Sequence, residues 1–487
     1  MIFDNTNYDL TFVHLNDIHG RVNGENNSIS FPKLFTFLES LRNNKKNGKV
    51  FLIDSGDTLH GTPFANFSKG ESIITLFNAL KFDYVTIGNH DFNYGFNHLK
   101  SLINLQTYKT LALNLIDKNN NTNILPYDIV TFNKFNICFF GLLTPETYYK
   151  TNSKNIINLE FTNPEESVKN LLNNLENKNI DLFVGITHLG CDKSTKIINQ
   201  SFNLANNFSK IDIIFDGHSH TEIKEKCIVN NTLISQAGSY NKNIAIIQLN
   251  LNDKKSKWKY KLMSSNDLDY YENNFYIENI IANIQNTQNS ISKTTIAYSK
   301  FPLIGDRESV RCKETNLTQL ITDAILWKTN SDAVLINGGS IRESISQGYI
   351  TIEDIFKSIP FNNHIVTKKI KGSNLKEALE NGLKAFPEPL GAMAQVSGMR
   401  VVFNPNNPPY KRVSEIYIKN NPIILDNYYN IAVTDFMSSG GEEYTSLIQG
   451  ENINYYSSVE DIVIDYLKNI KIEISPQINS RLIYKIY

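Results

Sequence analysis

The sequence has 487 residues, of which 41% are hydrophobic and 20% are charged, and its formal net charge is -1. A chain of this length exceeds one ordinary core, so two domains are expected. The neutral charge argues against a stable nucleic-acid partner, and no apolar run approaches the roughly 18 residues of a membrane span. The cysteines form no C-x-x-C pair, which excludes a structural zinc knuckle or a disulfide framework as an expectation.

Apolar runs alternate with helical patterns through the first half of the chain. The runs expected to be strands are 10–15, 50–53, 82–85, 111–115, 137–143, 182–186 and 211–215. The patterns that predict helices are 31–41, 73–80 and 164–175. This alternation predicts a layered α/β domain over residues 1–264.

A polar but periodic stretch at 271–291 predicts a helical connector, and we expect a linker over residues 265–297. The remaining residues, 298–487, are expected to form a second α/β domain. Its predicted helices are 317–328 and 374–386, and its predicted strands are 333–336, 400–403 and 431–433.

Short polar motifs follow five of the expected strands in the first domain. They are Asp17-Ile18-His19, Gly56-Asp57, Gly88-Asn89-His90-Asp91, Thr187-His188 and Gly217-His218-Ser219-His220. Each motif alone is commonly a turn. Together they place five of the nine histidines at strand ends, where α/β sheets open their ligand crevices. The combination therefore indicates a site.

Carboxylate, amide and imidazole groups in this pattern suit a pair of divalent metals. Two metals about 3.5–4 Å apart can clamp the oxygens of an in-line displacement at phosphorus, and a shared carboxylate holds them close. Asp57 is the candidate bridge. The ligands expected for one metal are Asp17, His19 and His220, and those for the other are Asn89, His188 and His218. These mixed ligands suit zinc, manganese or iron better than magnesium.

His90, adjacent to Asn89, is expected to donate a proton or a hydrogen bond to the leaving group or to a phosphoryl oxygen.

The second domain offers two further candidate features. Asn337-Gly338-Gly339-Ser340-Ile341-Arg342 follows an expected strand, and Arg342 either binds a carboxylate or phosphate bidentately or is a solvated surface residue. Phe436 and Tyr444 flank the turn at Gly440-Gly441. Each aromatic either packs in the core or stacks on a base, which is worth about 1–3 kcal/mol.

The ordered motifs D-x-H, G-D, G-N-H-D/E-F, T-H and G-H-S-H resemble those of the calcineurin-like metallophosphoesterases. With N-G-G-x-I-R and a G-G-x-x-Y loop downstream, nearly the whole chain resembles the 5'-nucleotidase family and its cyclic-phosphodiesterase relatives. The resemblance implies a four-layer α/β/β/α metallophosphoesterase domain, a helical linker about which the domains rotate, and a second α/β domain that holds the nucleoside.

The resemblance also assigns roles residue by residue. The metal ligands it implies are Asp17, His19, Asp57, Asn89, His188, His218 and His220, with His90 as the catalytic histidine. The substrate-binding residues it implies are Asn337, Gly338, Gly339, Arg342 and Phe436, with Phe436 as one of two stacking aromatics.

Three positions depart from the 5'-nucleotidase pattern. Asn93 replaces the Asp that pairs with the catalytic histidine, and an amide can orient an imidazole without stabilising its charged form. Met393 takes the place of the second stacking aromatic, and Glu442 takes that of a ribose-binding Asp. The form G-N-H-D-F-N-Y-G is similar to that of 2',3'-cyclic-nucleotide 2'-phosphodiesterases, which also act as 3'-nucleotidases.

The leading hypothesis is a two-metal 5'-nucleotidase, a monomer or homodimer. The alternatives are a 2',3'-cyclic-nucleotide 2'-phosphodiesterase with 3'-nucleotidase activity, a nucleotide-sugar or dinucleotide hydrolase, and a non-catalytic nucleotide-binding protein. The resemblance implies a periplasmic or extracellular location. Residues 1–8 lack the basic and apolar regions of an export signal, so a cytoplasmic location is the alternative.

Overall fold

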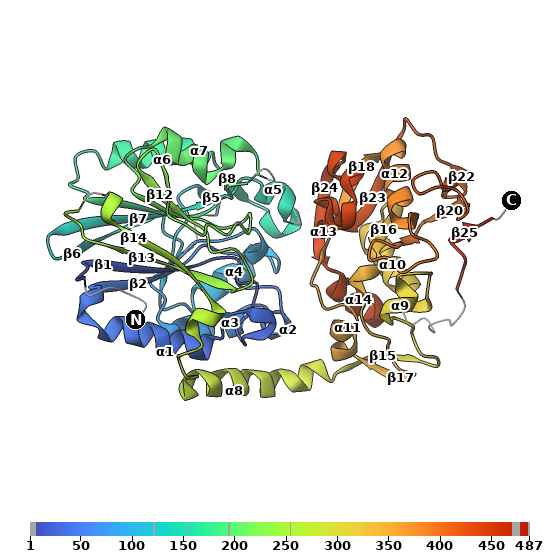
Figure 1. Ribbon diagram of the computed structural model, residues 1–487, viewed down its shortest axis with the longest axis horizontal. Coiled ribbons are helices and arrows are strands. Elements are labelled where there is room, and N and C mark those ends of the chain that lie inside the picture. Colours follow the sequence, from blue (N-terminus) through green and yellow to red (C-terminus); the bar gives the residue numbers. More distant parts are fainter. Residues whose placement is uncertain are drawn as a thin grey trace. The chain divides into compact units, whose positions relative to one another are not determined.

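The computed structural model describes residues 6–119, 122–151, 153–192, 195–253, 255–469 and 478–485. Of the segment 1–8, discussed above for an export signal, residues 1–5 lie outside the described part. The chain divides into two compact units, Met1–Gln288 and Asn289–Tyr487 (Figure 1). The finer division into 1–264, 265–297 and 298–487 remains a prediction.

The first unit contains two six-stranded sheets. One sheet has the order β14-β13-β1-β2-β3-β4, and its strands are β1 (Leu10–Leu15), β2 (Lys49–Asp54), β3 (Tyr84–Val85), β4 (Lys109–Thr110), β13 (Asn243–Leu249) and β14 (Lys259–Ser264). The other has the order β11-β12-β10-β9-β7-β6, and its strands are β6 (Tyr127–Phe132), β7 (Phe135–Leu143), β9 (Leu182–His188), β10 (Ile213–Phe215), β11 (Cys227–Val229) and β12 (Thr232–Ser235).

Parallel pairing of strands determines where the polar loops of the first unit lie. β1 pairs in parallel with β2, and β2 with β3. In the other sheet β9 pairs in parallel with both β7 and β10. The carboxyl ends of parallel strands meet at one edge of a sheet. The loops that follow β1, β2 and β3 therefore share one edge of the first sheet, and those that follow β9 and β10 share one edge of the second.

Aromatic and aliphatic side chains fill the space between the two sheets, including Phe12, Phe51, Phe139 and Phe215. The Phe12 and Phe51 rings are stacked with their centroids 5.6 Å apart, an arrangement that adds to the burial energy of each ring.

Helices cover the outer faces of both sheets. The core cluster outside the first sheet includes residues of α1 (Phe31–Asn43), α3 (Glu71–Leu80) and α4 (Phe96–Ile103). The cluster outside the second includes residues of α6 (Pro164–Asn174) and α7 (Ser201–Asn207). Figure 1 shows α1 and α3 on one side of the sheets, with α6 and α7 on the other. The predicted four-layer α/β/β/α arrangement is therefore confirmed.

Local sequence explains where these helices begin. Ser30 caps α1 by accepting from the Lys33 N–H, and Asn163 caps α6 by accepting from Glu165 and Glu166 N–H groups. Both helices have proline in their first turn, where its missing N–H costs no helical bond.

The strand expected at 111–115 is wrong. Residues 111–114 lie between β4 and the short strand β5 (Leu115–Asp117), which pairs with β8 (Leu159–Phe161). Asn114 explains the difference, because its side chain bonds both the N–H and the C=O of Leu143, at 2.9 and 2.8 Å. A side chain thus takes the place of a backbone ladder. The remaining helices of this unit are α2 (Pro63–Asn66) and α5 (Thr147–Lys150).

The second unit contains a five-stranded sheet of order β19-β16-β23-β18-β24, with β16 (Ala333–Asn337), β18 (His364–Lys371), β19 (Ala394–Ser397), β23 (Tyr428–Thr434) and β24 (Glu451–Ser458). A four-stranded sheet has the order β22-β21-β20-β25, with β20 (Met399–Phe403), β21 (Val413–Ile418), β22 (Asn421–Pro422) and β25 (Leu482–Tyr484). β15 (Thr295–Ser299) pairs with β17 (Gly348–Thr351).

The helices of the second unit include the predicted α10 (Asn316–Thr329) and α12 (Gly372–Leu383). The others are α9 (Arg307–Val310), α11 (Ile352–Ser358), α13 (Asp435–Ser438) and α14 (Val459–Asn469).

The predicted connector is the helix α8 (Phe275–Ser292). Ile277 and Ile281 of α8 are buried in the core of the first unit, and the chain divides after Gln288. Across the described residues, no helix combines the length and apolar character needed to span a bilayer.

Candidate metal centre and substrate-binding residues

Two groups of potential metal ligands lie in the first unit, and each combines residues that follow strands of both sheets. One donor atom from each of Asp17, His19 and His220 lies within 4.8 Å of the other two, and Asp57, His188 and His218 form a second group of the same kind. Each group collects residues from loops or strand ends far apart in the sequence, which the parallel pairing brings together.

Five of these six residues have left-handed backbone conformations. Their φ angles are 49° for Asp17, 47° for His19, 56° for Asp57, 79° for His218 and 56° for His220. Such a conformation costs a residue with a side chain about 1–2 kcal/mol. Strain of this kind persists where surrounding structure enforces it, and it clusters at functional sites.

Two glycines make room for the ligands. A Cβ on Gly88 would lie 2.1 Å from Asp57 Oδ1. A Cβ on Gly217 would lie 2.9 Å from His188 Nδ1 and 3.0 Å from Asp17 Oδ2. The glycines of G-N-H-D and G-H-S-H are thus required by the close approach of the neighbouring side chains.

The donor set fits a divalent metal. His188 Nδ1 donates to the Ser55 carbonyl at 2.6 Å, which directs the Nε2 of a neutral ring inward. That Nε2 lies 3.2 Å from Asp57 Oδ2. Both His188 Nε2 and Asn89 Oδ1 are buried without a hydrogen-bond partner. Inward-facing lone pairs beside a carboxylate are what a cation satisfies.

Electrostatics favour the ligating forms of Asp57, His19 and His218. Burial alone would raise the pKa of Asp57, but His188 and His90 lower it well below its ordinary value. Burial lowers the pKa of His19 and of His218 to about 4, so both rings are neutral at pH 7.

His188 differs from these two rings. Burial lowers its pKa, but the charges of Asp57 and Asp17 raise it to about 10. A proton and a metal are therefore alternative partners for its inner nitrogen.

Asn89 and His90 enter the same site from the loop after β3. The His90 N–H donates to Asp57 Oδ1 at 2.7 Å. The Asn93 amide lies 3.4 Å from His90 Nδ1. Since the amide nitrogen can only donate, it directs the proton of a neutral His90 ring to Nε2.

Asp91 is a site residue whose role sequence reasoning missed. Its carboxylate accepts from the N–H groups of Asp57 (3.0 Å), Thr58 (3.0 Å), Leu59 (3.0 Å) and Gly88 (2.8 Å). It therefore fastens the G-D loop to the G-N-H-D loop. No side-chain pattern could indicate this role, because the partners are backbone groups of another loop.

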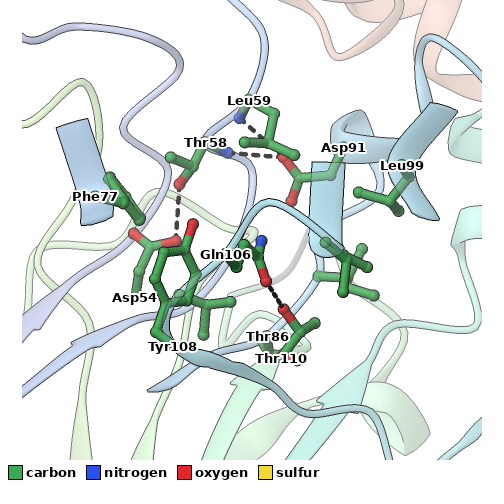
Figure 2. Close-up of a pocket in the computed structure, with 13 residues that line it drawn as sticks. Asp54, Thr58, Leu59, Phe77, Thr86, Asp91, Leu99, Gln106, Tyr108 and Thr110 are labelled. Carbon is green, nitrogen blue, oxygen red and sulfur yellow. Dashed lines mark hydrogen bonds between the residues drawn. The ribbon is translucent and has the colours of Figure 1, made fainter. Parts of the chain in front are cut away.

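Figure 2 shows Asp91 at the edge of a small cavity, with Asp54 held by the Thr58 hydroxyl on another side. Burial raises the pKa of Asp91 to about 6 and that of Asp54 well above its ordinary value. Because Thr58 and Asp91 line it, the cavity lies beside the loop that carries Asp57.

Tyr240 also borders the first ligand group. Its ring centroid is 5.5 Å from those of both His19 and His220. The Arg21 guanidinium lies over the same ring at 5.0 Å. An aromatic after Gly238-Ser239 was the sequence signal available, but it is too common to indicate a site.

In the second unit, backbone bonds join some of the predicted substrate-binding residues. Gly338 N–H donates to the Met393 carbonyl at 2.7 Å, and Gly339 N–H donates to the Gly391 carbonyl at 2.8 Å. A Cβ on Gly391 would lie 2.4 Å from Glu442 Oε1, so this carboxylate packs against the same segment. Asn337 Oδ1 is buried there without a hydrogen-bond partner.

Two arginines lie near this set. The Arg342 guanidinium lies 4.8 Å from the centre of the Phe361 ring. Burial and the charges of Arg307 and Arg342 lower the pKa of Arg311, while Glu442 raises it. Arg311 Nε is buried without a partner. Sequence reasoning missed Arg311, because a lone Arg near a short helix carries no motif.

The aromatic candidates separate by exposure. Phe436 is 45% exposed. Tyr444 is fully buried, with its hydroxyl donating to the Ala392 carbonyl at 2.5 Å, so it packs in the core. Met393 is 2% exposed, and its backbone carbonyl accepts from the Gly338 N–H.

Family models match both parts of the chain. A calcineurin-like phosphoesterase domain matches residues 10–222, and a 5'-nucleotidase C-terminal domain matches residues 292–449.

Individual relatives extend these matches. A trifunctional nucleotide phosphoesterase protein of Bacillus subtilis, YfkN, is 26% identical over 98% of this chain, which spans 35% of that longer protein. A snake venom 5'-nucleotidase of Crotalus adamanteus is 25% identical over 98% of this chain and 89% of its own length.

Among solved structures, a 5'-nucleotidase precursor of Thermus thermophilus aligns with a TM-score of 0.60 and 25% identity, covering 98% of this chain and 99% of its own. The two matched domains occur in the same order as the two units of the structure. The chain therefore belongs to the 5'-nucleotidase family of phosphoester hydrolases, which joins a calcineurin-like phosphoesterase domain to a 5'-nucleotidase C-terminal domain.

Proposed function

We propose that the protein is a two-metal 5'-nucleotidase, which hydrolyses a nucleoside monophosphate to a nucleoside and phosphate. The observation that carries the proposal is the pair of ligand groups, Asp17 with His19 and His220, and Asp57 with His188 and His218. Asn89 completes the second group with its buried side-chain oxygen, Oδ1. Asp57 is the carboxylate proposed to be shared. The names of relatives from snake venom and bacteria support nucleotides as the substrate class.

The proposed chemistry divides between the cofactor and the chain. Two bound divalent cations supply Lewis acidity at the phosphoryl group and activate water as the nucleophile. Nε2–H of His90 donates to the leaving-group oxygen or to a phosphoryl oxygen, and the Asn93 amide holds the ring in that tautomer. The Asp91 carboxylate holds the two ligand loops together by accepting from four backbone N–H groups.

The second unit is proposed to bind the nucleoside part. Arg342 and Arg311 offer cationic, planar groups of donors to the substrate. Phe436 is exposed enough to stack on a base, and Glu442 can accept from ribose hydroxyls. Gly338 and Gly339 bond the Met393 and Gly391 carbonyls, and the Asn337 amide also donates to Gly391, so these residues fix the segment against which Glu442 packs.

A second candidate function follows from Asn93. The 3.4 Å contact with His90 Nδ1 orients the ring, but an amide does not stabilise a positive imidazolium as a carboxylate would. The sequence G-N-H-D-F-N-Y-G around Asn93 is similar to that of 2',3'-cyclic-nucleotide 2'-phosphodiesterases, which supports hydrolysis of 2',3'-cyclic nucleotides and 3'-monoesters as the alternative. The same centre could also act on nucleotide sugars or dinucleotides.

Phosphate release from the Mn-loaded protein tests these options. The substrates are AMP, 3'-AMP and 2',3'-cyclic AMP, the last coupled to a phosphatase, and Asp57→Asn is the control. Preference for AMP supports the proposal, whereas preference for the cyclic and 3' substrates supports the second function. Equal inactivity of the protein and the control on all three substrates, with nucleotide still bound, would assign the chain to nucleotide binding alone.

The metal identity, compartment and assembly are also proposals. The mixed oxygen and imidazole donors support zinc, manganese or iron. Family resemblance supports a periplasmic or extracellular site of action and a monomer or homodimer. Metal analysis of protein from its native source, cell fractionation and light scattering test these three points.

A further inference from the structure

The segment 146–151 lies beside the second ligand group. Two of its charged side chains, Glu146 and Lys150, contact His218. Lys150 Nζ lies 2.7 Å from His218 Nε2 and 2.9 Å from Glu146 Oε2. Glu146 Oε2 also lies 3.6 Å from His218 Nε2. The Glu146 carboxylate is 2% exposed, and its other oxygen accepts from the Lys196 N–H at 3.0 Å. One ring nitrogen therefore faces both an ammonium and a carboxylate.

The segment 146–151 also contacts Asn89. The Thr151 hydroxyl donates to the Asn89 carbonyl at 2.6 Å, and the Asn89 amide nitrogen lies 3.5 Å from the Lys150 carbonyl. The segment thus contacts both Asn89 and His218, which are candidate ligands of one metal. Within the described ranges, no comparable group of Glu and Lys side chains contacts His19 or His220 by an ion pair.

The two charged groups make opposite demands on His218. Among the described residues, the ion pair of Lys150 is with Glu146 and not with Asp57, so the ammonium lies away from the carboxylate of the ligand group. Nδ1 is then the nitrogen left to ligate a metal. Ligation through Nδ1 places the ring proton on Nε2, where it needs an acceptor. Glu146 can accept that proton, whereas the Lys150 ammonium can only donate.

We propose that Glu146 and Lys150 set the affinity of the second metal in opposite directions. Glu146 supports ligation by accepting from His218 Nε2–H. Lys150 opposes ligation because it occupies Nε2 as a donor and adds positive charge near the metal. An acceptor on the outer nitrogen is the usual condition of a metal-bound histidine, whereas an ammonium on it is not. We therefore expect the two metals to bind unequally, with the group of Asp57, Asn89, His188 and His218 as the weaker one. This inference rests on the metal centre of the proposed function, but it concerns metal affinity and not the substrate.

Calorimetric titration of Mn²⁺ into the chelator-treated full-length protein tests the proposal, with the EPR spectrum of bound Mn²⁺ as a second readout. The protein should bind Mn²⁺ in two resolved steps. Lys150→Met should tighten the weaker step about tenfold, because it removes one charge close to a divalent cation. Glu146→Gln should weaken that step about 10–100-fold. The tighter step should change less than about threefold in both variants, since its ligands keep their partners.

Two further variants separate charge from packing. Lys150→Arg keeps the charge and should bind Mn²⁺ like the unchanged protein. Lys357→Met removes a lysine from an exposed i,i+4 ion pair with Glu353, at 2.6 Å, and should leave both steps unchanged. Circular dichroism checks that each variant folds. The Lys150→Met result stands by itself if Glu146→Gln does not fold.

Several outcomes would overturn the inference. They are two equivalent metals in the unchanged protein, equal shifts of both steps, or weaker metal binding in Lys150→Met. An unchanged metal affinity with a raised KM in Lys150→Met would instead assign Lys150 to substrate phosphate. Absence of nucleotide hydrolysis with the expected metal shifts would overturn the proposed function and leave this inference standing.

Discussion

Individual residues at the metal centre are held in positions that they would not adopt alone. Asp17, His19, Asp57, His218 and His220 share left-handed backbone conformations. At about 1–2 kcal/mol for each residue, this strain is comparable with a large share of the stability of an ordinary domain. Gly88 and Gly217 permit the crowding that the strained loops create.

Substitution of Gly88 tests whether this crowding matters. In Gly88→Ala the new Cβ would lie 2.1 Å from Asp57 Oδ1, so the carboxylate has to move away from its ligating position. We expect at least a hundredfold loss, roughly, of kcat with AMP, together with reduced metal content. Full metal content with unchanged kcat would show that the position of Asp57 is not critical.

Asn93→Asp tests the assignment of His90. A carboxylate at this position would accept from His90 Nδ1 and stabilise the protonated ring. We expect kcat with AMP to rise several-fold, roughly, relative to kcat with 2',3'-cyclic AMP, while metal content stays the same. Steady-state kinetics on both substrates measures this. A uniform fall on both substrates would mean that Asn93 has a different role.

Among the secondary-structure elements, those that carry the motifs were predictable from sequence. β1, β2, β9 and β10 are nearly continuous apolar runs, and each ends at a polar motif. β18 was not predicted, because the lysines of His364–Lys371 obscure its pattern. Lys368 is 3% exposed there, with its ammonium bonded to the Ser438 hydroxyl at 2.9 Å.

Sequence also identified the candidate ligands but not the groups that support them. The motifs that contain Asp17 and His188 indicate metal binding only in combination with the other three motifs. Asp91, Glu146 and Arg311 act through backbone groups or through partners distant in sequence, and only the folded chain brings these together.

Glu460, at the start of α14, predicts how the free energy of unfolding depends on pH. Burial raises the pKa of Glu460 to about 8, from an ordinary value of 4.5. The folded state therefore holds this proton where the unfolded state has released it, and the free energy of unfolding falls as pH rises from about 4.5 to 8. The contribution is roughly 5 kcal/mol at most.

Glu460→Gln should remove this dependence, because an amide does not ionise. The Asn362 N–H donates to Glu460 Oε1 at 2.7 Å, and the amide oxygen of the variant can accept the same bond. Denaturant unfolding of the second unit, followed at pH 5 and pH 8.5, compares the two proteins. The variant should be the more stable one at pH 8.5 and similar at pH 5. Parallel pH profiles would exclude Glu460 as the cause.

For the whole molecule, the two units should respond differently to metal. Bound metal stabilises only the unit that binds it, by about 4 kcal/mol at a thousandfold excess over Kd. Scanning calorimetry should show a transition of Met1–Gln288 that moves upward with Mn²⁺ and a transition of Asn289–Tyr487 that does not. A common shift of both transitions would contradict the confinement of the metal centre to the first unit.

The most direct measurement of the two-metal mechanism is AMP hydrolysis as a function of Mn²⁺ added to the chelator-treated protein. Since both ligand groups contribute to the chemistry, activity should stay low through the first equivalent of metal and rise as the second binds. Asp57→Asn should stay inactive throughout. Full activity after one equivalent, or activity that persists in excess chelator, would contradict a two-metal nucleotidase.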